Sequence, residues 1–181
     1  MSIYYSNPYS TSKNFGKAIN DFCRLVPNDN DWIVIQDGDI IYLTSDWGER
    51  IHKALEMDGD KFGLIGCYTN RLRNTHQLHN NQFSFNHDLT YHYLISETYN
   101  KEGIQDIGKL NVAGFFMAFK KSTWITCKGF DENTRVFDTM FNNKVRALSM
   151  KIGLIRSLYV YHGYRIWSKS DQPWNDYKHL K

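Results

Sequence analysis

The sequence has no long hydrophobic stretch. Its longest apolar run, Val112–Phe119, has eight residues including a glycine, whereas a membrane-spanning helix needs about 20 apolar residues. The N-terminus has no basic segment followed by an apolar one, so it does not have the pattern of a secretory signal. We therefore expect no membrane span and a cytoplasmic protein.

Cysteine and proline are scarce, with three residues of each. Cys23, Cys67 and Cys127 lie far apart and form no Cys-x-x-Cys pair, which excludes a zinc knuckle and a thioredoxin-like redox site. Cys67 and Cys127 lie in or beside apolar runs, so we expect both to be reduced core residues. This cysteine usage fits a reducing compartment.

The sequence also lacks a large charge excess of one sign. Lys and Arg number 22 against 19 Asp and Glu, and the net charge is +3. The basic residues are scattered, whereas nucleic-acid-binding proteins concentrate them in a stripe. Residues 71–73 are the densest basic stretch and are expected to form a solvated loop. The histidines His76, His79, His87 and His92 lack the spacing of a zinc site. We predict no nucleic-acid partner.

The composition is that of one folded domain. Hydrophobic residues make up 41% and charged residues 23% of the 181 residues, enough to bury a core without disulfides. Short apolar runs typical of buried strands alternate with the spacing of amphipathic helices. We predict strands at 3–6, 32–35, 62–68, 111–119 and 153–161, and helices at 13–25, from Asp46 onward and at 137–148. This order predicts an α/β fold with a mixed, mostly parallel central sheet flanked by helices.

Two segments lack this alternation. Residues 69–108 are polar and weakly periodic. We predict long loops with one hairpin there, and a loop region of this length is usually functional or mobile. Residues 163–181 are polar and aromatic, and we predict a tail that forms a lid or a contact in a homo-oligomer.

Gln36-Asp37-Gly38-Asp39 directly follows the predicted strand at 32–35. Ligands of open α/β sheets bind at the carboxyl ends of strands. Two carboxylates at positions i and i+2 of an extended segment point the same way, and Gly38 allows close backbone approach. Hard oxygen ligands suit Mg²⁺ or Mn²⁺. We predict that Asp37 and Asp39 share a divalent cation, or that one holds the cation while the other takes a ribose hydroxyl. The alternative is a solvated turn.

Other acidic residues are weaker candidates. Asp29-Asn-Asp31 and Asp58-Gly-Asp60 precede their strands and are interpreted as turns. Asp138, near a helix start, and the Asp131-Glu132 pair are candidate general bases. His162 ends the last predicted strand and is a candidate third metal ligand, with a hydrogen-bonded bystander as the alternative.

In their order along the chain, these motifs resemble the family 2-like glycosyltransferases of the GT-A fold. The corresponding segments are Asn14-Phe-Gly-Lys-Ala-Ile-Asn20, Asp37-Gly-Asp39, Gly114–Phe119, Lys128-Gly-Phe-Asp-Glu132, Val136-Phe-Asp138 and Val160-Tyr-His162. The match runs from about residue 13 to residue 162. Each motif is degenerate, and the specificity comes from their order and spacing.

The resemblance implies a single GT-A-like domain over residues 1–181, with a donor half at 1–68 and an acceptor half at 69–162. It implies a metal-dependent, inverting glycosyltransferase of the hexosyl type. The donor would be a nucleotide-diphosphate sugar, a UDP-sugar in preference to a GDP-sugar. The acceptor would be a hydroxyl of a carbohydrate or glycoconjugate.

The resemblance also implies roles for individual residues. Asp39, Asp37 and His162 would hold Mn²⁺ or Mg²⁺, and the donor would be bound by Asp37, Gly38, Asp39, Asn14 and Tyr5. Asp138 would be the general base, with Glu132 as the second choice, and Asp131 and Glu132 would shape the acceptor pocket. Trp124 or Trp167 would stack on a sugar.

The sequence departs from the family pattern in places. Phe137 stands where the family usually has Glu, and Met140 where an acidic residue is common. About a dozen residues precede the helix at 13–25, where the family usually has two strands and a helix, and 3–6 is the strand expected there. Two alternatives therefore stay open. One is a non-catalytic relative that binds a nucleotide sugar or glycan. The other is a metal-dependent phosphoryl- or nucleotidyl-transfer enzyme.

Overall fold

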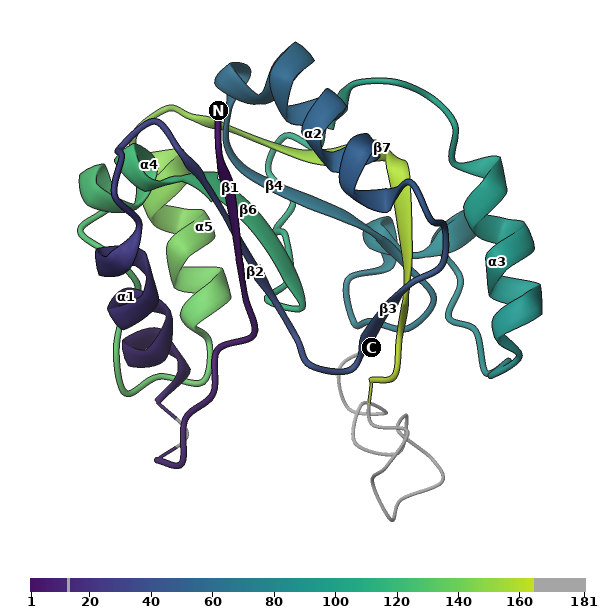
Figure 1. Cartoon of the computed structure of the whole chain (residues 1–181). Helices are drawn as coiled ribbons and strands as arrows, with labels where there is room; N and C mark the ends of the chain where they lie inside the picture. Colours follow the sequence, from purple (N-terminus) through teal and green to yellow (C-terminus); the bar gives the residue numbers. More distant parts are fainter. Residues whose placement is uncertain (13, 165–181) are drawn as a thin grey trace.

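The computed structural model describes residues 1–12 and 14–164 (Figure 1). Its strands and helices are β1 (Ile3–Ser6), α1 (Phe15–Leu25), β2 (Trp32–Gln36), β3 (Ile40–Tyr42), α2 (Trp47–Asp58), β4 (Phe62–Thr69), α3 (Leu89–Thr98), β5 (Ile104–Asp106), β6 (Phe116–Lys120), α4 (Lys121–Thr126), α5 (Phe137–Ala147) and β7 (Lys151–His162). The predicted strands at 3–6, 32–35, 62–68 and 153–161 and all three predicted helices are present. No described helix is long and apolar enough to cross a membrane.

The described strands form one sheet in the order β1-β2-β6-β4-β7-β3, and β5 pairs with the first part of β7. β1 is parallel to β2, and β4 is parallel to β7. β6, β3 and β5 are antiparallel to their partners. Four of the described strands, including the two longest, therefore share one direction, and the predicted mixed sheet is confirmed.

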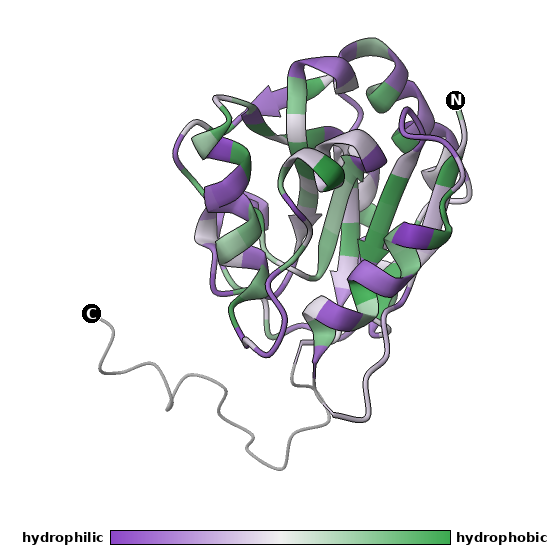
Figure 2. Ribbon diagram, turned by 90° about the vertical axis from the view of Figure 1, so that its left-hand side faces the viewer, coloured by the Kyte–Doolittle hydropathy of each residue, from purple (hydrophilic) through white to green (hydrophobic). Residues whose placement is uncertain are grey.

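Each face of the sheet carries a hydrophobic core. Residues of α1 and α5, such as Ile19 and Phe141, pack on one face, and residues of α2, such as Ile51, pack on the other. The central strands are largely apolar, and the helices alternate apolar and polar segments (Figure 2). Cys67 and Cys127 are buried with free thiols, as expected.

The prediction of long loops with one hairpin over residues 69–108 is wrong in two respects. The segment contains α3, and its strand β5 pairs with β7 instead of closing a hairpin within the segment. α3 has no apolar period because its buried residues are His92 and Ser96, whereas Tyr93 and Leu94 are exposed. A helix that buries polar residues gives no periodic hydrophobic signal.

The strand predicted at 111–119 begins only with β6. In the residues before β6, backbone groups form hydrogen bonds with side chains of α5 and not with a neighbouring strand. Asn142 bonds both the N–H (2.9 Å) and the carbonyl (2.7 Å) of Val112, and Asp138 accepts the N–H of Gly114 at 3.1 Å. Buried backbone groups need such partners, so this segment, which ends in a turn at Gly114 and Phe115, is held without pairing as a strand.

His92 connects α3 to the sheet and is fully buried. Its Nε2 lies 2.8 Å from the carbonyl oxygen of Asn86, which can only accept, so Nε2 carries the proton. Nδ1 then accepts the Tyr159 hydroxyl at 2.7 Å. Burial lowers the pKa of His92, and the hydrogen bond to Asn86 opposes this only in part. The buried ring is therefore neutral at neutral pH.

We expect His92 to make the fold less stable in mild acid. Its pKa in the folded protein lies below the unfolded value of 6.5, so the unfolded chain takes up the proton first. The contribution is present above pH 6.5 and is lost as the pH falls toward the folded pKa. Urea unfolding measures the free energy of unfolding at about pH 7.5 and about pH 5.5. Between these two pH values it should fall less in His92→Gln than in the wild type. Equal losses would contradict this role.

Candidate functional site

The turn between β2 and β3 brings Asp37 and Asp39 beside the end of β7. The N–H of Asp37 donates to the carbonyl of Phe115 at 2.9 Å, and the N–H of Gly163 donates to the carbonyl of Asp39 at 2.9 Å. β3 pairs antiparallel with the end of β7 up to His162. These contacts bring the three residues together at the ends of β2 and β7, which lie on the same side of the sheet (Figure 1).

Asp37, Asp39 and His162 form a compact cluster, which we call the Asp–Asp–His cluster. Nε2 of His162 lies 3.6 Å from Oδ2 of Asp37 and 3.4 Å from Oδ1 of Asp39. One donor atom from each of the three residues lies within 4.8 Å of the other two. Asp37 is exposed, Asp39 is half-buried and His162 is 2% exposed. The cluster therefore has a buried nitrogen end and an open carboxylate end.

Three contacts hold His162, two at its ring and one at its backbone N–H. Its Nδ1 lies 3.0 Å from the carbonyl oxygen of Arg71, which can only accept, so Nδ1 carries a proton and Nε2 faces the carboxylates. The His162 N–H donates to Oδ1 of Asn70 at 2.7 Å. The ring stacks on Phe115 with centroids 5.0 Å apart and planes at 19°. This arrangement is typical of a metal-ligating histidine whose second nitrogen is hydrogen-bonded to the protein.

The three groups also shift one another's ionisation. Burial by itself lowers the pKa of His162, but the carboxylates of Asp37 and Asp39 outweigh it and raise the pKa to about 9. The hydrogen bond and charge of His162 lower the pKa of Asp39, and partial burial opposes this. Without a cation the ring is therefore protonated and compensates the carboxylates.

The donor set fits a divalent cation. Mn²⁺ and Mg²⁺ take carboxylate oxygens at about 2.1 Å, so adjacent ligands of an octahedral ion lie about 3 Å apart. The observed separations of 3.4 and 3.6 Å need only small side-chain movements to reach this geometry. Two carboxylates and one imidazole would also cancel the cation's charge. The structure thus brings together the three side chains that the sequence proposed as ligands.

Asp138 lies in the first turn of α5, which begins at the same edge of the sheet (Figure 1). Its Oδ2 accepts the N–H of Gly114 at 3.1 Å, and its Oδ1 accepts the N–H of Thr139 at 2.7 Å. Gly114 directly precedes Phe115, whose ring stacks on His162. Each carboxylate oxygen keeps one lone pair for a further contact.

Glu132 and Asn14 belong to a polar network between α1 and the loop before α5. Asn14 accepts the N–H of Lys17 at 3.0 Å as the cap of α1, and its Nδ2 donates to Oδ1 of Asn133 at 2.9 Å. Nδ2 of Asn20 donates to Oε1 of Glu132 at 3.1 Å. These two site residues predicted from the sequence therefore already have hydrogen-bond partners within the protein.

Asp131 pairs with Lys144 of α5 at 2.8 Å and packs against Gly16 of α1. An added Cβ at Gly16 would lie 2.1 Å from the carbonyl oxygen of Asp131. The Asn-x-Gly pattern of the sequence thus has a packing reason, because only glycine lets α1 and this loop approach so closely.

We expect Gly16→Ala to lower the free energy of unfolding by about 1–3 kcal/mol, because its Cβ meets backbone that has to move. Gly48→Ala in α2 is the matched control. No atom of the described residues lies within 4 Å of a Cβ at Gly48, and the higher helix propensity of alanine predicts a gain of up to about 1 kcal/mol. Urea unfolding compares the two, and a Gly16→Ala variant as stable as Gly48→Ala would contradict the contact.

Two donor-binding residues predicted from the sequence lie near β1 and β2. Tyr5 is half-buried, and its ring meets Trp47 edge-on at 5.5 Å. Trp47 in turn stacks on Tyr42 at 4.0 Å. Gly38 is exposed, and the nearest atom to an added Cβ is Nδ2 of Asn7 at 4.0 Å. Tyr5 thus belongs to an aromatic cluster, while Gly38 leaves open space beside the carboxylates.

The resemblance also implied that Trp124 or Trp167 stacks on a sugar. Trp124 donates its Nε1–H to Asn20 at 2.9 Å, between α4 and α1, and Trp167 lies outside the described residues. Sequence reasoning missed Asn70, Phe115 and the carbonyl of Arg71, which hold His162. Phe115 stands in an apolar run that predicts core, and a backbone carbonyl leaves no signal in a sequence.

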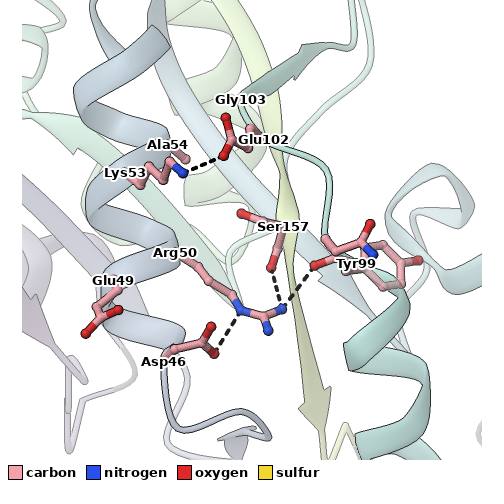
Figure 3. Close-up of a pocket in the computed structure, with 10 residues that line it drawn as sticks. Asp46, Glu49, Arg50, Lys53, Ala54, Tyr99, Glu102, Gly103 and Ser157 are labelled. Carbon is pink, nitrogen blue, oxygen red and sulfur yellow. Dashed lines mark hydrogen bonds and ion pairs between the residues drawn. The ribbon is translucent and has the colours of Figure 1, made fainter.

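A cavity of about 310 Å³ lies between α2, the end of α3 and β7 (Figure 3). Arg50 extends across it. Its Nε donates to Asp46 at 2.9 Å, and its Nη1 donates to the carbonyls of Tyr99 (3.0 Å) and Ser157 (3.3 Å). The guanidinium is thus used to connect three elements, and we interpret this cavity as structural.

Comparisons with known proteins support the fold. No family model matches the chain, and no curated protein matches it in sequence. A solved structure of a mannosyltransferase from Pyrobaculum calidifontis, in complex with GDP-Man and Mn²⁺, is similar with a TM-score of 0.51 and 16% identity. The similarity covers 84% of this chain and 38% of that one, so this chain spans well under half of that protein's length. The chain therefore has a glycosyltransferase-like mixed α/β fold.

Proposed function

We propose that this protein is a metal-dependent glycosyltransferase of the GT-A type. It transfers a hexosyl group from a nucleotide-diphosphate sugar to an acceptor hydroxyl, with inversion at the anomeric carbon. The observation that carries the proposal is the Asp–Asp–His cluster, with its donor atoms within 4.8 Å at the edge of a glycosyltransferase-like sheet. The similar mannosyltransferase structure contains GDP-Man and Mn²⁺.

On the donor side, the protein supplies a preorganised ligand set. Asp37, Asp39 and Nε2 of His162 would hold Mn²⁺ or Mg²⁺. A bound divalent cation neutralises the charge that develops on a diphosphate leaving group. The Arg71 carbonyl keeps Nε2 of His162 directed at the carboxylates. The open space at Gly38 admits the donor beside them.

Tyr5 and Asn14 complete the proposed donor half at residues 1–68. The aromatic cluster of Tyr5 and Trp47 lies at the side of β2 and offers a wall for the nucleotide. Asn14 acts by capping α1, because its side chain already bonds Lys17 and Asn133. Both UDP- and GDP-sugars are candidate donors, and the family resemblance favours UDP.

On the acceptor side, residues 69–162, we propose Asp138 as the general base. The acceptor oxygen forms a bond to the anomeric carbon while the bond from that carbon to the diphosphate oxygen breaks, and the hydroxyl proton passes to a carboxylate oxygen of Asp138. Glu132 is the second candidate. Asp131, paired with Lys144, would shape the acceptor pocket.

Calorimetry with UDP, GDP and their sugars, with and without Mn²⁺, tests the proposal. Binding that requires Mn²⁺, together with release of the nucleoside diphosphate when acceptor is added, supports the transferase. Mn²⁺-dependent binding without any release would indicate a non-catalytic relative. Cleavage within the diphosphate would indicate phosphoryl or nucleotidyl transfer. No binding to any of these nucleotides would contradict the proposal.

A further inference from the structure

A second groove lies along β4, β5 and the end of α3. Two cavities of about 320 and 400 Å³ share Tyr68, Asn80, Tyr99 and Gln105, and so form one continuous groove. None of the residues that line them belongs to the Asp–Asp–His cluster or is Asp138. The proposed transfer reaction leaves this groove unexplained.

The groove has a rigid aromatic wall. The half-buried rings of Tyr68 and Tyr99 lie 5.0 Å apart at 45°. The Tyr68 hydroxyl donates to Oε1 of Gln105 at 2.9 Å. Nε2 of His79 accepts the amide of Asn80 at 3.1 Å, so its Nδ1 carries the proton and donates to the Tyr99 oxygen at 3.1 Å.

These bonds leave polar groups free around the rings. The Nε2 amide group of Gln105 and the Oδ1 of Asn80 have no bonded partner among the described residues, and the Tyr99 O–H remains available as a donor. A sugar ring has an apolar C–H face and a rim of hydroxyls. Tyr99 stacks on Tyr159 with centroids 5.3 Å apart, and the exposed parts of the half-buried Tyr68 and Tyr99 rings match the apolar face. Amide and hydroxyl groups match the hydroxyl rim. The wall is therefore suited to a pyranose.

One end of the groove also carries positive charge. Lys101 and Arg156 line it, and neither forms an ion pair with any described residue. The nearby acidic groups already have partners: Asp106 pairs with Lys151 at 3.1 Å, and Glu102 pairs with Lys53. An exposed, unpaired lysine and arginine beside this wall favour a ligand that brings its own carboxylate.

We propose that this groove binds an acidic oligosaccharide. A sugar ring packs on Tyr68 and Tyr99, its hydroxyls bond Gln105 and Asn80, and a uronate carboxylate pairs with Arg156 and Lys101. Binding requires no metal and no nucleotide, so this site is separate from the proposed transferase site. The ligand is recognised by both its sugar ring and its charge.

Calorimetry on the whole protein in EDTA tests this with tetrasaccharides of galacturonate, of mannuronate and of hyaluronan, each beside its methyl ester. We expect at least one acidic tetrasaccharide to bind. Its methyl ester should bind about tenfold more weakly, because esterification removes a charged hydrogen-bond acceptor. Added salt should weaken binding of the acid far more than binding of the ester.

Variants assign the binding to the groove. Arg156→Gln should weaken binding of the acidic tetrasaccharide about tenfold and leave binding of its methyl ester unchanged. Gln105→Ala should weaken binding of both. Arg135→Gln removes the same charge from an exposed residue outside the groove and should have no effect. Asp39→Ala should bind the tetrasaccharide normally, which separates this proposal from the transferase. The proposal is overturned if no acidic tetrasaccharide binds, if acid and ester bind equally, or if Arg156→Gln binds like the wild type.

Discussion

Asp39→Ala should abolish metal-dependent nucleotide binding, with a loss of affinity on the order of 100-fold or more. Asp39 is half-buried, and its Oδ1 lies 3.4 Å from Nε2 of His162. Removing it leaves one exposed carboxylate and one imidazole, which are too few to hold a cation against water. Calorimetric titration with Mn²⁺ alone, and with UDP or GDP in the presence of Mn²⁺, measures the loss.

Asp60→Ala is the matched control. Asp60 belongs to another Asp-x-Asp sequence, its side chain is 83% exposed, and it pairs with Lys120. This variant removes the same carboxylate chemistry from a surface turn and should bind nucleotide like the wild type. If Asp39→Ala, folded as judged by thermal unfolding, kept wild-type affinity, the Asp–Asp–His cluster would not be a metal site.

Asp138→Asn should reduce turnover by about 10²–10⁴-fold while leaving nucleotide binding close to normal. An amide cannot take the proton of the acceptor hydroxyl at neutral pH. Asp138 lies outside the Asp–Asp–His cluster, so its loss should affect kcat rather than the binding of metal and donor. Release of the nucleoside diphosphate in the presence of acceptor measures turnover, and calorimetry on the same sample measures binding.

Glu132→Gln is the comparison for this prediction, since Glu132 is the second candidate base. In Asp138→Asn itself a small loss of stability is expected. Both oxygens of Asp138 accept backbone N–H groups, and an amide can accept only one of these two bonds. Loss of turnover in Glu132→Gln alone would move the base to Glu132. Normal turnover in both variants would contradict the mechanism.

The fold was predictable where periodic patterns are strong. α1, α2 and α5 each bury one apolar side, and β2 is a continuous apolar run ending at a polar turn. The failures have one physical cause. α3 buries His92 and Ser96, and the segment before β6 is satisfied by Asn142 and Asp138. In α3, polar side chains occupy buried positions where a sequence pattern expects apolar residues. Before β6, polar side chains bond the backbone groups that a neighbouring strand would otherwise bond.

The candidate site was predictable only in part, because some of its residues are marked by local spacing and others depend on contacts distant in sequence. Asp37 and Asp39 follow a buried strand and lie two residues apart, which is local information. Asn14 and Gly16 also stand in a recognisable pattern, but their reasons are contacts with Asn133 and Asp131, more than 100 residues away. The spacing of such residues identifies them but does not predict what they contact.

The sequence by itself determined the helices α1, α2 and α5, the strands β1, β2, β4 and β7, and the position of the two carboxylates at the end of β2. Only the tertiary structure decided that His162 points at them. Its ring is oriented by the Arg71 carbonyl and Phe115 and its backbone N–H is bonded by Asn70, all distant in sequence. The same holds for the groove of Tyr68 and Tyr99, to which β4, α3, β5 and β7 all contribute residues. Hydrophobic spacing is a local property, whereas the direction of a buried polar side chain depends on which partners the fold brings within hydrogen-bond distance.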